Sequence, residues 1–563
     1  MATSSLSSLG LGSSGALSYD TIDKLRAVDE QAILNPIDAK LTTNTTKQTD
    51  LSALTSLANT LKLSTTALSE ENNYLQRTTT VSNDAISVTT QAGTTVDNFT
   101  IHVNTLASQD IYQSTNFASQ TSTFTSANDT LSLAIGTNTY AIDVTSTTTL
   151  TDLKNMINEK AGGKITASIL NVGGTNPYRL VIKSNSTGAD NAITLSSTGG
   201  GTAVTDLGLG LGANHLKTAS DASFVYNGVT VSRTSNTISD LIVGTSLVLN
   251  KEQTDAATNT TVSITQDWTN ITTNLKSLVT SYNDLMAKLK TATAYDTTAK
   301  TAGTFQGVTQ INTLSTEIRK QVLGVDSEGR GLSDYGVSMN TEGKLEFNAT
   351  TFNAKVAADP ADVKDYFLGS TTYSTTSYKG SAVSAGGLSI GADAFSINGT
   401  AITFTTLSTS TIADNLAAIK TAINNAGLTG IEASLGTNDN IVLKGAAGAD
   451  IVITGDSTAL SSLGLQVTNI YSSPTTKEGI FTKFNSMLTS YVNTTDGTLT
   501  QYNKSLGTEK TALTKTRATA VKRLDTKYEA MATKFAAYDS IINKLTNQFS
   551  SLSSMIKQSY VSK

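Results

Sequence analysis

An unbroken apolar stripe at the C-terminal end of the chain constrains the fold more than any other feature. Apolar residues alternate three and four positions apart there, at Val521, Leu524, Tyr528, Met531, Phe535, Tyr538, Ile542, Leu545, Phe549 and Leu552. Neither Pro nor Gly interrupts residues 508–563, and a break is predicted upstream at Asp496-Gly497. Sustained heptad spacing predicts a long helix in a coiled coil or bundle. Because such a helix exposes its stripe unless something covers it, we expect the stripe to be an interface.

The N-terminal end carries a second, weaker helical pattern. Residues 1–18 are Ser, Gly and Leu without periodicity, and we expect a flexible tail there. Near-heptad spacing follows, and the positions expected at an interface are Ile22, Leu25, Ile37, Leu41, Leu51 and Leu61. Asn44 and Gln48 place amides on the same side, where burial costs stability but fixes register. We therefore expect residues 19–70 and 478–563 to pack together as a leg, or against neighbouring subunits, with two unrelated bundle helices as the alternative.

Between the two ends, alternating apolar and polar residues replace the helical period. Only 15% of residues are charged, and Thr, Ser, Asn and Gly make up much of the remainder, which suits half-exposed sheets because Thr is β-branched. The sequence therefore predicts a multidomain α+β fold, with long helices from both termini in the leg and several small Thr-rich β domains forming the outer part. Asn227-Gly228 predicts a hairpin turn, and apolar heptads from Asp267 and from Ile311 predict two helices.

Two of the β-rich stretches share one order of elements. Both read strand, strand, helix and three strands, with a Gly-Ala-Asp turn and a final Leu-Gly-Leu; the second copy is expected to begin with a strand at Leu388–Gly391. We interpret them as copies of one unit, with chance similarity as the alternative. The expected domains between the leg helices are 71–115 (start of an α+β core), 116–218 (first copy), 219–370 (hairpin and helical core) and 371–477 (inserted second copy).

Several classes of function are excluded by what the sequence lacks. The chain has no Cys, and His102 and His215 are isolated, so nucleophile sets and metal sites have little to build on. Gly208–Gly212 lacks the spacing of a phosphate loop, and Asp326–Gly329 has too few oxygens for a calcium loop. A net charge of −5 without a basic run argues against nucleic acid. We therefore expect a structural or interaction protein with no cofactor and no enzymatic activity.

The same features bear on location. No stretch approaches the roughly 20 apolar residues that span a bilayer, so membrane insertion is not expected. The first residues lack the basic and apolar regions of a cleaved signal peptide. Absence of Cys is typical of a chain that leaves the cell. If the protein is secreted, we expect a route that does not use a cleaved signal.

Several stretches resemble the family of flagellar filament-capping proteins, also called hook-associated protein 2. The order of these stretches makes the resemblance specific, and together they cover most of the chain. The two internal copies resemble the flagellin hook repeat associated with the family. The residues that carry the resemblance are Gly10–Gly15 with Asp20–Leu25, Phe224, Asn227-Gly228-Val229, Arg233, Ser235–Ile242, Gly244, Leu247–Leu249, Leu278–Leu285, Tyr335-Gly336-Val337 and Gly343-Lys344-Leu345.

The resemblance implies a structural cap at the distal end of the bacterial flagellar filament that promotes insertion, folding and polymerisation of exported flagellin. It implies secretion through the flagellar type III export apparatus, with an export chaperone bound to the C-terminal helices. It also implies self-association as a homo-oligomer, a pentamer on the filament. The second copy, at about residues 380–466, is an insertion that shorter members lack, so their domain count does not carry over.

Three alternatives remain from the sequence alone. Another flagellar axial protein, such as a hook–filament junction protein or flagellin, shares the terminal helices, but the central stretch at 220–249 argues against it. A β-rich adhesin or surface-layer protein fits the Thr-rich copies but gives the terminal heptads no role. A glycosidase with paired carboxylates predicts saccharide turnover that carboxylate substitutions abolish.

Overall fold

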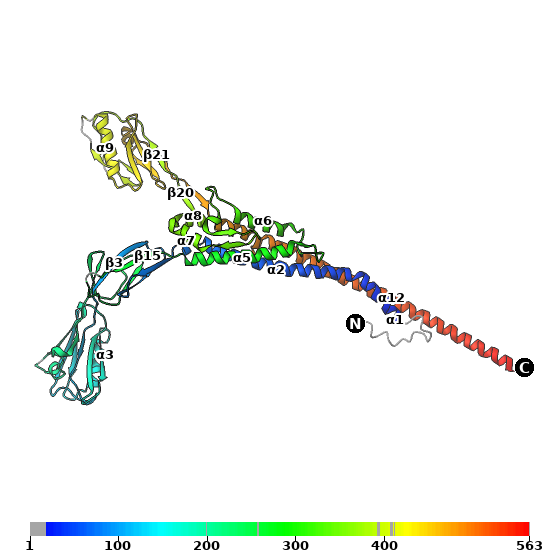
Figure 1. Cartoon of the computed structure of the whole chain (residues 1–563), viewed down its shortest axis with the longest axis horizontal. Helices are drawn as coiled ribbons and strands as arrows, with labels where there is room; N and C mark the ends of the chain where they lie inside the picture. Colours follow the sequence, from blue (N-terminus) through cyan, green and yellow to red (C-terminus); the bar gives the residue numbers. More distant parts are fainter. Residues whose placement is uncertain are drawn as a thin grey trace. The chain divides into compact units, whose positions relative to one another are not determined.

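A computed structural model describes residues 19–198, 200–255, 258–390, 394–405, 409 and 411–561, and the predicted tail at 1–18 lies outside these residues. Contacts divide the chain into two compact units, Met1–Glu70 with Thr272–Lys563, and Glu71–Ile271. The chain is mixed α+β, with long terminal helices that pack together and several small antiparallel sheets (Figure 1). The predicted fold class is therefore confirmed.

The terminal helices of the first unit form the predicted leg. Helices α1 (Tyr19–Ile33) and α2 (Asn35–Ser69) come from the N-terminal end, and α11 (Ile480–Val492) and α12 (Thr498–Val561) from the C-terminal end. α2 packs against both α11 and α12, and α1 packs against α12. Pro36 lies in the first turn of α2, where its missing N–H costs no hydrogen bond. The gap between α11 and α12 contains the predicted break at Asp496-Gly497.

The same unit also has a helical core, which contains the two helices predicted from the heptads at Asp267 and Ile311. It contains α5 (Thr269–Thr293), α6 (Thr309–Leu323), α7 (Ala349–Ala358) and α8 (Pro360–Leu368), with the strand pairs β16–β17 (Tyr295–Asp296 and Thr301–Ala302) and β18–β19 (Val337–Met339 and Leu345–Phe347). On α5, Leu275, Leu278, Tyr282, Leu285 and Leu289 are fully buried. Three- and four-residue spacing thus predicted the buried face of α5 correctly.

The second unit is built on antiparallel sheets. One sheet has the order β1-β15-β3-β11-β12, with strands Arg77–Val81, Thr260–Gln266, Asp97–Thr105, Ala222–Tyr226 and Val229–Arg233. Another has the order β13-β14-β2, with strands Thr237–Ile238, Thr245–Leu249 and Ile86–Thr90. Asn227 and Gly228 join β11 to β12 with φ angles of 45° and 87°. Positive φ at both positions is the geometry of the predicted type I′ turn.

We call residues 111–217, in the second unit, the first β segment. Its sheets have the orders β10-β4-β8-β7 and β6-β5-β9, and its helices are α3 and α4. The bounds are β4 Ile111–Gln113, β5 Asp129–Ile135, β6 Asn138–Val144, α3 Leu150–Ala161, β7 Ile165–Asn171, β8 Tyr178–Ser184, β9 Ile193–Thr198, α4 Ala203–Asp206 and β10 His215–Lys217.

We call residues 369–478, in the first unit, the second β segment. The chain enters and leaves it through an antiparallel ribbon of β20 (Gly369–Tyr373) and β30 (Pro474–Glu478). Beyond the ribbon lie sheets with the orders β21-β27-β26 and β24-β23-β28-β29, and the pair β22–β25. The bounds are β21 Thr376–Lys379, β22 Ser389–Ile390, β23 Phe395–Ile397, β24 Thr400–Ala401, β25 Phe404–Thr405, α9 Ile412–Asn425, β26 Ile431–Leu435, β27 Ile441–Gly445, β28 Ile451–Gly455, α10 Ser457–Ser462 and β29 Thr468–Ile470.

The helices of the two β segments begin and end with the same contacts. Thr149 and Asp152 form a capping box at the start of α3, and Thr411 and Asp414 form one at the start of α9. Near each helix end an Asn side chain clamps both backbone groups of an Ala nine positions later, Asn158 with Ala167 and Asn424 with Ala433. The clamping Asn lies nine residues after the N-cap in α3 and thirteen in α9, so about one more helical turn precedes the clamp in α9.

The strand expected to open the second copy was Leu388–Gly391, of which Gly391 lies outside the described residues, and its described part is not the equivalent of β5. β5 pairs with β6 and β9, and the strand with the matching partners is β23, which pairs with β24 and β28. Ser389 and Ile390 form β22, which pairs with β25 instead. Asn398-Gly399, with φ angles of 49° and 76°, makes the hairpin turn after β23. The Asn-Gly pair is a sequence signal for this hairpin, and it would have located β23 and β24. The apolar alternation at residues 388–391 is similar to that of β23, so the strand was placed there instead.

Candidate functional site

The helical seam, where α1 and α2 meet α11 and α12, is the region that the sequence pattern singled out. Between α1 and α12 a small apolar cluster is buried, with Val521, Met531 and Phe535 packed at its edge. Its buried members are Ile22, Leu34, Leu524, Tyr528 and Ala532. On α2, Leu51 and Leu61 are buried, while Ile37 and Leu41 are half-buried. Leu25 is 45% exposed and lies outside the cluster.

Charged side chains cross the seam and set its register. Asp29 accepts hydrogen bonds from Lys527 Nζ at 2.5 Å and from the Tyr528 hydroxyl at 2.8 Å. These two contacts hold the pKa of the Asp29 carboxyl below its usual range. Further along the seam, Asp38 pairs with Arg517 at 2.6 Å. Since residue numbers rise on α1 and α2 as they fall on α12, the helices run antiparallel.

A buried amide also lies on the seam, as the sequence suggested. Asn44 is buried and donates from Nδ2 to the Leu506 carbonyl at 3.1 Å and to Glu509 Oε2 at 2.9 Å. Its Oδ1 has no hydrogen-bond partner among the residues that the structure describes. An amide that is only partly satisfied costs free energy, but it favours the one alignment that pairs its donor.

The predicted stripe on α12 is covered only as far as Phe535. Beyond it the apolar side chains face solvent in the isolated chain, and Phe549 is 68% exposed. The exposed members are Tyr538, Ile541, Ile542, Leu545, Phe549, Leu552, Met555 and Ile556. We call this surface the bare stripe. Its neighbours on the helix are mostly Ser, Asn, Gln and Thr, so the surface is apolar and carries little charge.

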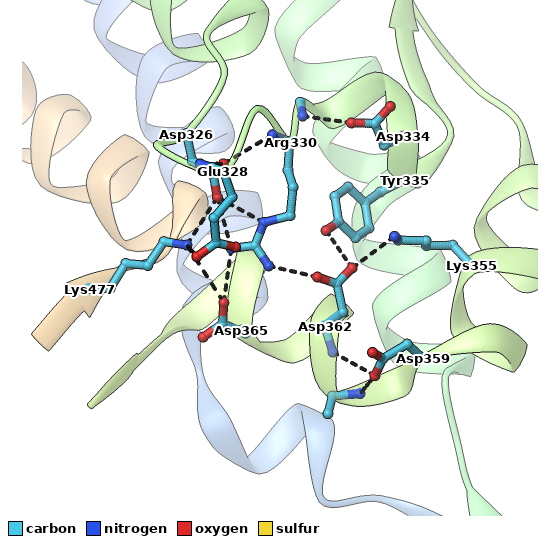
Figure 2. Close-up of polar contacts among 12 residues, drawn as sticks. Asp326, Glu328, Arg330, Asp334, Tyr335, Lys355, Asp359, Asp362, Asp365 and Lys477 are labelled. Carbon is cyan, nitrogen blue, oxygen red and sulfur yellow. Dashed lines mark hydrogen bonds and ion pairs between the residues drawn. The ribbon is translucent and has the colours of Figure 1, made fainter. Parts of the chain in front are cut away.

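A network of charges surrounds Arg330 and was not predicted from the sequence (Figure 2). Arg330 is only 13% exposed and its guanidinium contacts Asp326 at 2.8 Å, Asp362 at 2.7 Å and Asp365 at 2.9 Å. Asp326 also accepts the backbone N–H groups of Glu328 and Arg330, which shapes the loop. We call these residues, with Glu328, Lys355, Tyr335 and Lys477, the Arg330 network. The carboxylate oxygens of the loop thus bind Arg330 and Lys477 within the chain, where the sequence had offered only a comparison with a calcium loop.

The contacts within the network favour the ionised form of its Asp side chains. Burial alone would raise the pKa of Asp362, but hydrogen bonds from Lys355, Arg330 and Tyr335 outweigh it and lower the pKa to about 2. Burial likewise opposes ionisation of Asp326, and the Arg330 contacts hold its pKa well below the usual range. Burial and the hydrogen bond to Asp362 raise the pKa of Tyr335. Asp326 and Asp362 are therefore ionised at neutral pH, and Tyr335 stays a neutral hydrogen-bond donor.

The two His residues lie in separate places. His215 Nε2 contacts the buried Asp110 carboxylate at 2.6 Å and its ring stacks on Tyr112. His102 Nδ1 lies 2.9 Å from the carbonyl oxygen of Thr258. Nowhere in the described ranges do three His, Asp or Glu side chains meet in a way that could hold a metal ion. Among the described helices, none combines the length and apolar character needed to cross a bilayer.

Comparison with known proteins matches the chain to one family along nearly its whole length. The profile described as "Flagellar hook-associated protein 2 C-terminus" matches residues 219–433 and 456–547, and "Flagellar hook-associated protein 2 N-terminus" matches residues 14–110. The flagellar hook-associated protein 2 of Campylobacter jejuni is 31% identical over 643 residues, covering 99% of each chain. That of Escherichia coli K12 is 30% identical, covering 65% of this chain and 81% of its own. A crystal structure of "the flagellar cap protein FliD D1-D2-D3 domains from Escherichia coli" is similar with a TM-score of 0.41 and 28% identity, covering 57% of this chain and 91% of that one.

Proposed function

The chain belongs to the flagellar hook-associated protein 2 family, and from this premise we propose that its terminal helices carry the contacts through which the cap works on flagellin. The protein is a structural cap of the flagellar filament, located at the filament tip outside the cell, and it is not an enzyme. Family membership decides against the hook–filament junction, flagellin, adhesin and glycosidase alternatives.

The finer role concerns flagellin. The protein promotes the insertion, folding and polymerisation of exported flagellin subunits, and the bare stripe is the surface that meets them. The observation that carries this proposal is the division of one heptad pattern into a covered part and an exposed part at Phe535 and Tyr538. An exposed apolar patch of this kind marks a site of protein contact.

The chemistry of the bare stripe suits a partner that must be exchanged. From Tyr538 to Val561 the charged side chains are Asp539, Lys544 and Lys557. With so few charges to match, a helix with an apolar face can dock without a fixed set of ion pairs. Contacts of this type are tight when packed and can re-form with the next subunit, as a cap that moves with filament growth requires.

The remaining partners are part of the same proposal. The cap acts as a homo-oligomer, a pentamer on the filament, and the leg helices are where its copies meet one another and the filament end. Export proceeds through the flagellar type III apparatus. An export chaperone covers the C-terminal helices before export, since an uncovered apolar stripe favours aggregation in the cell.

A truncation that removes residues 538–563 tests the role of the bare stripe. Because those side chains contribute little to the folded chain, we expect the purified variant to unfold at the same temperature as the full chain. In cells we expect short or missing filaments and unpolymerised flagellin in the medium. Immunoblots of the medium for the cap protein itself separate a failure of capping from a failure of export. Filaments of normal length from a secreted truncated cap would contradict the proposal.

A point variant makes the test milder. Ile542→Asp places a charge in the centre of the bare stripe, and an unpaired charge is costly wherever a partner would bury it. Ser540→Asp adds the same charge at an exposed position off the stripe and is the matched control. We expect released flagellin from Ile542→Asp and not from Ser540→Asp, with equal stability of the two purified proteins. Equal flagellin release from both variants would locate the contact elsewhere.

A further inference from the structure

We infer that Lys477 and Arg330 are positioning residues for the second β segment, which they hold at its stem by a latch of shared carboxylates. The stem is the ribbon of β20 and β30, paired in register from Gly369 opposite Glu478 to Tyr373 opposite Pro474. Most side chains of this ribbon are exposed. A two-stranded ribbon without an apolar core is only marginally stable in water, so the stem needs contacts at its base.

The base of the stem is closely packed backbone. Gly369 has a φ of 93°, and a Cβ there would meet the Lys477 carbonyl and the Gly479 amide. The Gly479 amide donates to the Leu368 carbonyl at 3.1 Å, and the Thr482 hydroxyl donates to the same oxygen at 3.0 Å. These contacts fix where the chain leaves α8 and enters α11. They do not fix the direction in which the ribbon extends from that point.

Lys477, which lies on β30, fixes this direction through its ion pairs. Its ammonium contacts Glu328 at 2.6 Å, Asp326 at 3.3 Å and Asp365 at 3.8 Å. The Arg330 guanidinium contacts the same three carboxylates, at 2.8 to 3.0 Å. Two cations therefore share one set of acids, one cation from the stem and one from the loop that carries Asp326 (Figure 2). The shared acids join the stem to that loop and to α8.

The degree of burial decides how such a latch behaves. Arg330 and Asp326 are mostly buried, and removing one member of a buried set leaves the others without compensation. Lys477 is 25% exposed and Glu328 is 55% exposed, so the stem side of the network is more open to solvent and salt. Loss of Lys477 leaves Arg330 with its carboxylates in place. The network thus has a buried part, Arg330 with Asp326, and a more exposed part, Lys477 with Glu328. The contacts of Lys477 can break while the buried part stays folded.

Distances between spin labels in the full chain test the latch, and the natural absence of Cys makes labelling straightforward. Lys276→Cys on α5 and Lys420→Cys on α9 are exposed positions outside the network. We expect Lys477→Met to broaden the distance distribution between these labels about twofold, because the stem gains freedom at its base. Lys477→Arg, which keeps the charge, should restore the narrow distribution. Raising NaCl to about 1 M, where the screening length is about 3 Å, should broaden the distribution of the unmutated chain.

Lys344→Met is the matched control. Lys344 pairs with Glu342 at 3.0 Å in the same unit but outside the network, and both side chains are exposed. If Lys477→Met and Lys344→Met give distributions of equal width, the latch is overturned. A second label pair within the core, Lys276→Cys with Thr313→Cys on α6, must stay narrow in Lys477→Met. Broadening of that pair as well would assign Lys477 to core folding and overturn the positioning role. All readouts use the purified chain, so failure here leaves the proposed flagellin contact untouched.

Discussion

The two halves of α12 carry the same heptad pattern but have different surroundings. Up to Phe535 the stripe is covered by α1 and α2, and Leu524 is 3% exposed. From Tyr538 onward the stripe is bare, and Ile542 is 47% exposed. Periodicity specifies a helix and its need for a partner, but it does not distinguish a partner within the chain from a partner outside it.

The charges beside the stripe do distinguish the two halves. The covered half is flanked by side chains that reach across the seam, such as Arg517 to Asp38 and Lys527 to Asp29. Such flanking pairs choose partner and register in helical assemblies. From Tyr538 to Val561 the bare half has three charged side chains, which are too few to set such a pattern of flanking pairs. This difference supports the proposal that the covered half has a single fixed partner and the bare half binds successive partners.

Shortening a covered side chain should have the largest effect. Leu524→Ala removes buried apolar contacts in the cluster with Ile22 and Leu34, at a cost of about 2–5 kcal/mol in the pairing of α1 with α12. Hydrogen exchange of the α1 amides, residues 19–33, should speed up accordingly. Leu552→Ala in the bare half is the control, with an expected effect within about 0.5 kcal/mol. Equal effects at the two positions would mean that α1 does not cover α12 in solution.

A smaller effect of the opposite sign is expected at the buried amide. Asn44→Leu replaces an amide whose oxygen is unsatisfied, and Glu509, an exposed residue, can turn to water. We expect the free energy of unfolding to stay the same or to rise by about 1 kcal/mol, and we expect α2 and α12 to lose their single alignment. Denaturant unfolding measures the free energy, and sedimentation velocity detects the additional oligomers that other alignments would form. Asn547→Leu, at an exposed amide of the bare half, is the control for added apolar surface. A destabilised but uniquely paired Asn44→Leu variant would show that the amide is structural rather than selective.

Local patterns carried most of what the sequence could predict. The long C-terminal helix, the Asn227-Gly228 turn and the buried face of α5 each depend on neighbours within a few residues, and each was predicted correctly. The interface role of the whole α12 stripe stays a prediction. The two stripes also predicted that both ends need partners, and the structure shows that these partners include one another, a choice that periodicity alone could not make. The strand expected at Leu388–Gly391 was misplaced because alternation alone could not choose between two nearby Thr- and Ser-rich stretches.

What the sequence could not predict are contacts between charges far apart in the chain. Asp326 and Lys477 lie 3.3 Å apart across about 150 residues, and ion pairs leave no periodic trace. Asp29 and Lys527 are farther apart still in sequence. A hint was available, since Asp29 and Asp38 on one side and Arg517 and Lys527 on the other have the opposite signs that flank coiled-coil seams. The apolar spacing continues unchanged through Phe535 and Tyr538, so it could not predict that the covered part of the stripe ends there.

The smallest expected effect is a pH dependence confined to the covered half. The contacts of Asp29 with Lys527 and Tyr528 lower the pKa of its carboxyl in the folded chain, so they stabilise the seam above the ordinary carboxyl value of about 3.9. Protonation removes this contribution as the pH falls through the lowered value. We therefore expect the unfolding temperature, followed by circular dichroism between pH 5 and pH 2.5, to fall more steeply for the unmutated chain than for Asp29→Asn. Removal of the bare half by truncation at residue 538 should leave that difference unchanged, because Asp29 contacts Lys527 and Tyr528, which lie in the covered half. A difference that disappears on truncation would mean that the two halves are coupled, and the division drawn at Phe535 would fail.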